Sequence, residues 1–128
     1  MIRVLLDTHA FLWGGTDDVR LSAGARRAMT NAGEIFLSLA SCWEMAIKVS
    51  TGKLALTKPV EHFITGQLAL NPFFLRPVGL DDVARVATLP FHHRDPFDRM
   101  LAAQAINDGL TIVSADPIFR KYGVKRVW

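Results

Sequence analysis

The sequence predicts an α/β fold, in which helices alternate with the short strands of a mainly parallel sheet. Short apolar runs, rich in branched side chains, recur along the chain and are typical of strands buried on both faces. Longer segments with helix-capping and helix-ending residues lie between them. This alternation is the pattern of parallel strands joined by crossover helices. We therefore expect one domain over residues 1–128, with four or five strands and helices on both faces of the sheet.

The first half of the chain is expected to begin with a strand that ends abruptly at an acid. Gly14 and Gly15 should end the helix after it, Ser22 should cap the next helix, and Gly52 should stop a third. The expected order is strand Ile2–Leu6, helix Thr8–Trp13, helix Ser22–Asn31, strand Glu34–Leu39, helix Ser41–Val49 and helix Pro59–Leu70.

The second half contains the strongest helix signal. Asp95 is suited to the N-cap, Pro96 to the first turn and Gly109 to the C-terminal end. Pro72 and Pro77 should shorten the extended segment between them. The expected order is extended Phe73–Val78, helix Leu80–Leu89, helix Pro96–Asn107, strand Leu110–Val113, a short helix from Asp116–Pro117 to Gly123, and strand Val124–Trp128.

The composition indicates a folded domain and leaves the partner open. Of the 128 residues, 50% are hydrophobic and 21% are charged, which is enough apolar surface for a core and argues against disorder. The formal net charge of +3 and a pI of about 9.4 are compatible with a polyanionic partner without identifying one.

The single cysteine and the lack of long apolar stretches indicate the cellular compartment in which the protein is expected. Cys42 alone cannot form an intrachain disulfide or a cysteine-based zinc site, and it suits a reducing compartment. No stretch approaches the roughly 20 apolar residues of a membrane helix. We therefore expect a cytoplasmic protein without a membrane partner.

Four acids far apart in sequence are the candidate functional residues. Each also has a purely structural explanation. Glu44 stands three residues after Ser41, which is the spacing of a capping box. Asp116, like Asp95, precedes a proline and suits an N-cap, and Asp98 suits the dipole in the first turn of its helix. Asp7 could cap the segment that follows it.

Taken together, the four acids are expected at one edge of the sheet. Asp7 follows the first strand and Asp116 lies just past Leu110–Val113, while Glu44 and Asp98 are expected at helix N-termini on the same edge. Carboxylates so close together repel unless a cation is present, and hard oxygen ligands suit Mg²⁺ or Mn²⁺. Such a site can activate water and stabilise a transferring phosphoryl group.

The segments around these acids resemble the successive motifs of PIN-domain ribonucleases, and more narrowly the VapC-type toxins of bacterial toxin–antitoxin pairs. The resemblance covers nearly the whole chain, with the motifs in the right order. The segments are Leu5-Leu6-Asp7-Thr8-His9, Ser41-Cys42-Trp43-Glu44-Met45-Ala46-Ile47-Lys48, His93-Arg94-Asp95-Pro96-Phe97-Asp98-Arg99-Met100-Leu101-Ala102-Ala103-Gln104-Ala105 and Ser114-Ala115-Asp116-Pro117-Ile118-Phe119.

The resemblance implies a PIN-like nuclease domain that hydrolyses RNA phosphodiester bonds with a metal-activated water. It implies Asp7 and Asp98 as the principal metal ligands, with Glu44 and Asp116 completing the acidic pocket directly or through water. It also implies a cognate antitoxin that inhibits the enzyme, and a homodimer. Small hydroxyl residues accompany the first and last acids in this pattern: Thr8 and Ser114, the latter where threonine is commoner.

Residues next to the acids have two possible roles each. His92, His93 and Arg94 precede the main helix and either contact RNA phosphate, with a histidine as proton shuttle, or form a solvated loop. Arg99 either neutralises the scissile phosphate or points outward as an ordinary helix charge. Lys48 is expected to pair with Glu44 on the helix rather than to line a substrate groove.

Two further points remain open: the role of the tryptophans, and two other classes of protein to which the sequence could belong. Trp13 and Trp43 are expected as core or dimer contacts rather than as platforms for bases. One alternative is a catalytically inactive PIN-like binding module that acts through a protein partner. A receiver-like phosphoacceptor domain is also α/β with an acidic pocket, but such domains usually pair adjacent acids after the first strand, and here Thr8 follows Asp7.

Overall fold

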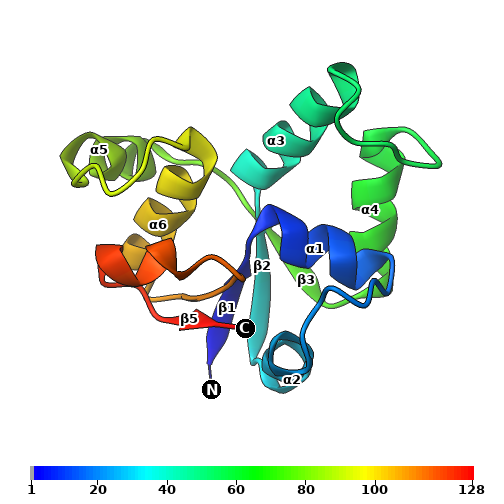
Figure 1. The fold of residues 1–128 in the computed structure, drawn as a ribbon, viewed down its shortest axis with the longest axis horizontal. Coiled ribbons are helices and arrows are strands. Elements are labelled where there is room, and N and C mark those ends of the chain that lie inside the picture. The colour runs from blue at the N-terminus through cyan, green and yellow to red at the C-terminus, as the bar shows by residue number, and fades with distance from the viewer. Residues whose placement is uncertain (1) are drawn as a thin grey trace.

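The computed structural model describes residues 2–128 as a five-stranded sheet surrounded by helices (Figure 1). All strand pairings in this part of the chain are parallel, and the order across the sheet is β3-β2-β1-β4-β5. The elements are β1 (Arg3–Leu6), α1 (Thr8–Gly15), α2 (Ala23–Asn31), β2 (Glu34–Ser38), α3 (Leu39–Ser50), α4 (Val60–Leu70), β3 (Phe73–Arg76), α5 (Leu80–Thr88), α6 (Pro96–Asp108), β4 (Thr111–Val113), the 3-10 helix η1 (Pro117–Tyr122) and β5 (Arg126–Val127). The predicted α/β class and parallel sheet are confirmed.

The topology reverses direction at the central strand. From β1 the chain builds outward through β2 to β3, then crosses back to place β4 on the other side of β1. Because crossovers between parallel strands are right-handed, the two directions place their helices on opposite faces. Accordingly α1 to α4 gather on one side of the sheet and α5, α6 and η1 on the other (Figure 1).

The core is divided by the sheet into two apolar layers. Along β1, Val4 and Leu6 belong to the layer under α1 to α4, and Leu5 belongs to the layer under α6 and η1. This alternation follows from the two-residue period of a strand, and it explains why the run at the start of the chain is apolar on both faces. Phe11 and Phe119 are the largest fully buried side chains of the two layers.

Most predicted helix ends are confirmed by their hydrogen bonds. The Ser22 hydroxyl accepts the Ala25 N–H at 3.0 Å, and the Asp95 carboxylate accepts those of Phe97 and Asp98 at 2.9 and 3.0 Å. Gly109 ends α6 in the left-handed conformation, with φ of 66°, that favours glycine. These caps fix the second and the sixth helix where the sequence predicted them.

Several boundaries differ from the prediction. α1 runs two residues further than predicted, because Gly14 and Gly15 form its last two positions and Thr16 is the C-cap. α3 begins at Leu39, because Ser38, not Ser41, accepts the N–H of Ala40 and acts as the N-cap. The last helix is a single 3-10 element, and β5 keeps only two residues of the predicted final strand. Within residues 2–128, no helix has the length and apolar character needed to cross a membrane.

Candidate active site

The predicted acids lie around the carboxyl ends of β1 and β4, where the topology reverses. Asp7 directly follows β1, and Ser114 directly follows β4. The two strands are hydrogen-bonded neighbours in the sheet. In open α/β sheets this switch point is where the connecting loops separate and leave a crevice. The Asp7 N–H also donates to the Val113 carbonyl at 3.1 Å, which extends the pairing of the two strands to the acid itself.

Asp7 is a buried acid held by its own helix. Its side chain is the N-cap of α1, and Oδ1 accepts the Ala10 N–H at 2.7 Å. Burial raises the pKa of Asp7 above its usual range, although hydrogen bonds from Ser114 and Ala10 act to lower it. The Glu44 charge adds to the rise, whereas His9 opposes it. The hydrogen bonds therefore fix the orientation of the Asp7 carboxylate, but they do not fully offset the cost of burying its negative charge.

Asp98 is the most strongly perturbed acid of the site. It lies in the first turn of α6, partly shielded from solvent. Burial raises its pKa to about 7, and the neighbouring negative charges contribute to the same rise. Those charges belong to Asp95, Asp7, Glu44 and Asp116. The electrostatic field at Asp98 thus shows that acids far apart in sequence come close in space.

Glu44 does not belong to a capping box, and that interpretation was wrong. Because α3 begins at Leu39, Glu44 lies in the second turn, beyond the free N–H groups of the first turn. Instead Oε1 accepts the Thr8 hydroxyl at 2.5 Å, and Oε2 lies 3.1 Å from Lys48 Nζ. The Lys48 pairing is the predicted helix pair. Thr8 thereby joins α1 to α3 across the carboxyl edge of the sheet.

Asp116 is the most exposed of the four acids and caps η1. Its Oδ1 accepts the Ile118 N–H at 2.9 Å, as the proline after it predicted. The fully buried Ser114 hydroxyl accepts the Asp116 N–H at 3.0 Å and bonds to Asp7. One serine therefore links the first and last acids of the sequence.

The carboxylate oxygens of the four acids are suitable ligands for a divalent cation, but the four side chains do not converge closely enough to enclose one. Across residues 2–128, no three His, Cys, Asp or Glu side chains are arranged to hold a metal ion. In the same range, no Lys or Arg forms an ion pair with Asp7, Asp98 or Asp116. Hard carboxylates without a basic partner are the chemistry that Mg²⁺ or Mn²⁺ compensates, so the residues fit the ion that the sequence implied.

His93 lies beside Asp98 and is anchored from behind. Its Nδ1 lies 2.8 Å from the Tyr122 hydroxyl, and its Nε2 is 3.6 Å from Asp98 Oδ2. The predicted solvated loop is thus only partly correct, because His93 is packed whereas His92 and Arg94 are exposed. The anchoring Tyr122 was missed in the sequence. Its only signal there was a polar aromatic residue in an otherwise charged segment, which does not identify its partner.

Arg99 corrects both predicted roles. It is 4% exposed, so it is not an outward charge, and its guanidinium is directed at backbone carbonyls rather than at solvent. The guanidinium donates to the carbonyls of Val86, Leu89 and Pro90 and lies 3.3 Å from the Tyr122 hydroxyl. These are carbonyls at and after the end of α5, which a buried cation stabilises. Arg99 therefore fixes α5 against α6.

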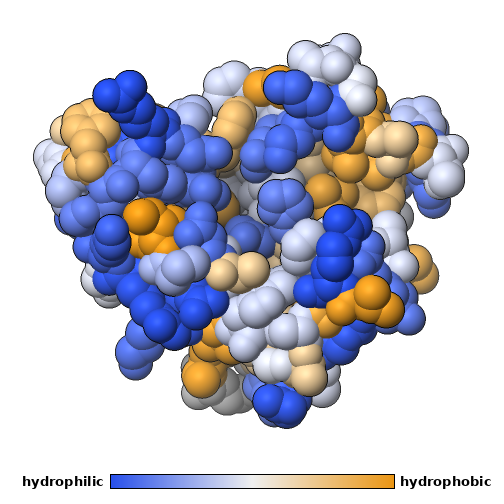
Figure 2. Space-filling view, viewed as in Figure 1, coloured by the Kyte–Doolittle hydropathy of each residue, from blue (hydrophilic) through white to orange (hydrophobic). Residues whose placement is uncertain are grey.

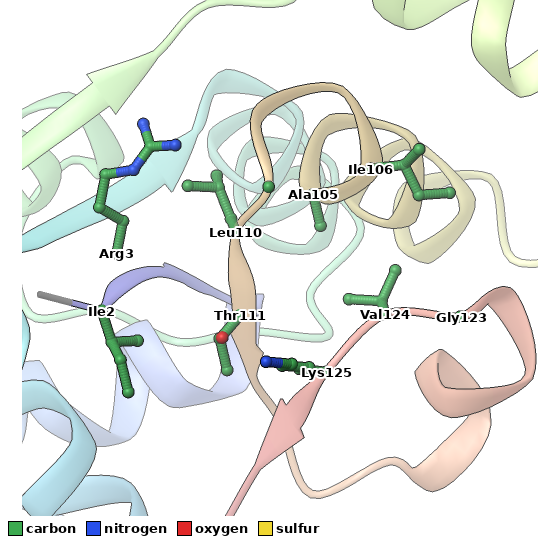
Figure 3. A pocket seen from close by; sticks show the side chains of 10 residues that line it. Ile2, Arg3, Ala105, Ile106, Leu110, Thr111, Gly123, Val124 and Lys125 are labelled. Carbon is green, nitrogen blue, oxygen red and sulfur yellow. The ribbon is translucent and has the colours of Figure 1, made fainter.

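The opposite edge of the sheet has a different chemistry. A cavity of about 460 Å³ lies there, between the start of β1 and the segment before β5 (Figure 3). Arg3 and Lys125 are its charged lining residues, and the described lining includes no carboxylate. Hydrophilic residues also gather over α6 and η1 on the face seen in Figure 2. None of the four predicted acids therefore lines this cavity.

The fold and the site define an α/β domain with an acidic centre at the switch point of a parallel sheet. The model of the PIN domain family matches residues 4–125. The chain belongs to the PIN domain family. It is also 32% identical over 125 residues to Ribonuclease VapC22 of Mycobacterium tuberculosis, a match that covers 95% of this chain and 93% of that protein.

Solved structures share the fold at low sequence identity. The DNA-bound VapBC of Salmonella typhimurium aligns with a TM-score of 0.70 at 15% identity, covering 98% of this chain and 97% of the other. VapBC2 of Rickettsia felis, bound to a DNA fragment from its promoter, gives 0.69 at 15% identity with the same coverage. VapBC-5 of Mycobacterium tuberculosis gives 0.62 at 18% identity, covering 98% of both chains.

Proposed function

We propose that the chain is a metal-dependent endoribonuclease that hydrolyses RNA phosphodiester bonds, with Mg²⁺ as its ion and Mn²⁺ as a substitute. The observation that carries the proposal is the placement of Asp7, Glu44, Asp98 and Asp116 around the carboxyl ends of β1 and β4, where burial and then the neighbouring acids raise the pKa of Asp98 to about 7. A site with this excess of negative charge repels RNA unless a cation is bound. The name of the relative Ribonuclease VapC22 supports the same activity.

The proposed site divides its tasks among the acids. Asp7 and Asp98 would hold the ion, and Glu44 and Asp116 would complete the pocket directly or through water. When bound, the ion supplies an activated water and neutralises charge on the phosphoryl group. The hydrogen bond from the Ala10 N–H fixes Asp7, and the Thr8 hydroxyl orients Glu44. These contacts hold the carboxylates in place before substrate arrives.

The residues around the acids have supporting tasks in this proposal. Ser114 positions Asp7 and Asp116 together through its buried hydroxyl. His93 stands against Asp98, with Tyr122 fixing the ring. Arg94 is exposed just before α6 and is the candidate for a contact with RNA phosphate. Arg99 has no direct contact with substrate.

We also propose that the chain is the toxin of a toxin–antitoxin pair, that a cognate antitoxin inhibits it, and that it forms a homodimer. The VapBC complexes among the structural neighbours support the antitoxin by analogy. A groove of about 450 Å³ between α3, α5 and α6 supports a protein contact, because its lining is almost entirely apolar. Trp43, 65% exposed, and Phe97 line it beside the acids.

The nuclease proposal is tested by incubating the purified protein with single-stranded RNA in Mg²⁺ and in EDTA. We expect cleavage in Mg²⁺, none in EDTA, and recovery when Mg²⁺ or Mn²⁺ is restored. Intact RNA under all conditions would favour the inactive binding module that acts through a protein partner. Cleavage that persists in EDTA would contradict the metal dependence.

The homodimer proposal is tested by replacing Trp43 with serine, using Leu70→Ser as a control. Leu70 is 81% exposed at the end of α4, away from the groove. Light scattering should give the mass of a dimer for the wild type and for Leu70→Ser, and the mass of a monomer for Trp43→Ser. A dimer that survives the Trp43 substitution would place the interface elsewhere.

A further inference from the structure

We propose that the cavity between α1 and the end of α3 is a nucleotide subsite, which holds the base and phosphate next to the cleaved bond of single-stranded RNA. This inference rests on the proposed nuclease function and specifies where the substrate strand lies. The cavity measures about 480 Å³, within the range of roughly 300–1,000 Å³ found for small-ligand sites. The side chains that carry the argument are His9, Trp13, Arg20, Lys48 and Lys53.

The cavity adjoins the acidic centre on two sides. His9 stands two residues after Asp7 in the first turn of α1 and lines the cavity. Lys48 lines the cavity and pairs with Glu44, with Nζ 3.1 Å from Oε2. A phosphodiester at the acids would therefore place its next nucleotide at the mouth of this cavity.

One wall of the cavity is aromatic. The rings of His9 and Trp13 have centroids 5.2 Å apart with 33° between their planes. The Arg20 guanidinium lies over the Trp13 ring, 4.8 Å from its centroid. Because the side chain of His9 is exposed, its ring can receive a base on its outer side. Unpaired bases are held in this way by aromatic rings and by planar guanidinium groups.

The opposite wall carries two lysines that a local turn brings together. Gly52, with φ of 76°, allows the chain to fold back after α3. The Gly52 N–H then donates to the Val49 carbonyl at 3.2 Å, and the Lys53 N–H donates to the Lys48 carbonyl at 2.8 Å. This is the Schellman arrangement, which places the residue after the glycine against the last turn of the helix. The turn therefore holds Lys53 beside Lys48.

The charges of the cavity favour a phosphate. Arg20 is neutralised by Asp18 at 2.7 Å, and Lys48 by Glu44. Lys53 is exposed and forms no ion pair within residues 2–128. An acidic peptide would satisfy the lysine but would leave the aromatic wall without a function. A nucleotide uses both, with its phosphate on Lys53 and its base on the rings.

The test measures RNA binding in an Asp98→Asn background, so that cleavage does not consume the probe. Every variant shares this background, so the loss of the ion at the acids is common to all of them and does not enter the comparison. The probe is a short single-stranded RNA of randomised sequence with a fluorescent label, followed by anisotropy over a range of salt concentrations. Lys53→Glu should weaken binding by about tenfold and lower the salt slope by about one. Lys125→Glu is the matched control, because Lys125 lies at the opposite edge of the sheet, and it should change neither quantity.

His9→Ala should weaken binding about fivefold or more without changing the salt slope, since it removes stacking and not a phosphate contact. Equal losses for Lys53→Glu and Lys125→Glu, or no loss for Lys53→Glu, would overturn the subsite. So would a Lys53→Glu protein that keeps its affinity for RNA and instead loses a co-purifying protein partner. Failure of the wild type to cleave any RNA in Mg²⁺ would instead overturn the nuclease proposal itself.

Discussion

Two carboxylate clusters of opposite character lie against helix α6, one near each end: Asp82 of α5 near its C-terminal end and Asp98 in its first turn. Near its C-terminal end, Asp82 is fully buried and its pKa is lowered. Burial acts to raise that pKa, but hydrogen bonds outweigh it. Both terminal nitrogens of Arg76 donate to the carboxylate, at 2.8 and 2.9 Å. The other donors are the Gly79 N–H and the side chains of Asn107 and Gln104. This cluster carries its own cation.

The cluster at the N-terminal end lacks such compensation. Burial and four neighbouring acids raise the pKa of Asp98 to about 7. Within residues 2–128, the one ion-pair contact of Asp98 is with His93, whose Nε2 lies 3.6 Å from Asp98 Oδ2. Burial acts to raise the pKa of both Asp82 and Asp98, yet the net shifts are opposite, because only the Asp82 cluster includes an arginine. A cation from solution is therefore expected at the cluster around Asp98, which has no arginine of its own.

The largest effect should follow from removing one carboxylate of the uncompensated cluster. Asp7→Asn or Asp98→Asn should lower RNA cleavage by at least about a thousandfold, about 4 kcal/mol of activation free energy, because the ion loses a principal ligand. Cleavage rates in Mg²⁺ measure this, with circular dichroism to check the fold. Asp81→Asn is the matched control, since Asp81 is an exposed acid on α5. Wild-type rates in either site variant would disprove the assignment of these ligands.

The compensated cluster should respond in stability rather than in chemistry. Arg76→Met leaves Asp82 buried without its cation and should lower the free energy of unfolding by about 3 kcal/mol. Urea unfolding at neutral pH measures the loss. Arg27→Met, at an exposed position on α2, should cost less than about 0.5 kcal/mol. Equal stabilities of the two variants would show that Arg76 does not compensate Asp82.

A smaller effect of the opposite sign is expected at Asp98 in the metal-free protein. Its folded-state pKa of about 7 exceeds the usual 3.8, so the folded state binds the proton more tightly. Wild-type stability therefore falls as the pH rises from about 4 to about 7. Asp98→Asn removes this loss and should stabilise the protein at pH 8 by on the order of 2 kcal/mol, after allowance for solvent screening.

The measurement for this variant is the thermal midpoint in EDTA across that pH range. The difference between Asp98→Asn and the wild type should be greatest above pH 7 and should vanish below about pH 4. A difference in thermal midpoint that is constant with pH would show that the pKa of Asp98 is not raised in the folded protein.

The fold was predictable from sequence because its signals are local. The capping residues Ser22 and Asp95 and the left-handed Gly109 act within one turn of their helices, and each was found where it was predicted. The edge shared by the acids followed from the rule that parallel strands end together.

Errors arose where a partner comes from far along the chain. Glu44 is bonded by Thr8, and Arg99 is buried against the end of α5. Neither contact leaves a trace in the neighbouring sequence.

The central claim is that the acids at the carboxyl edge of β1 and β4 form a divalent cation site. Calorimetric titration of Mg²⁺ into the metal-free protein at pH 8 tests it directly, without RNA or a partner. We expect saturable binding to the wild type and to Asp81→Asn, and none to Asp7→Asn or Asp98→Asn. Equal binding by the wild type and Asp98→Asn would contradict the claim.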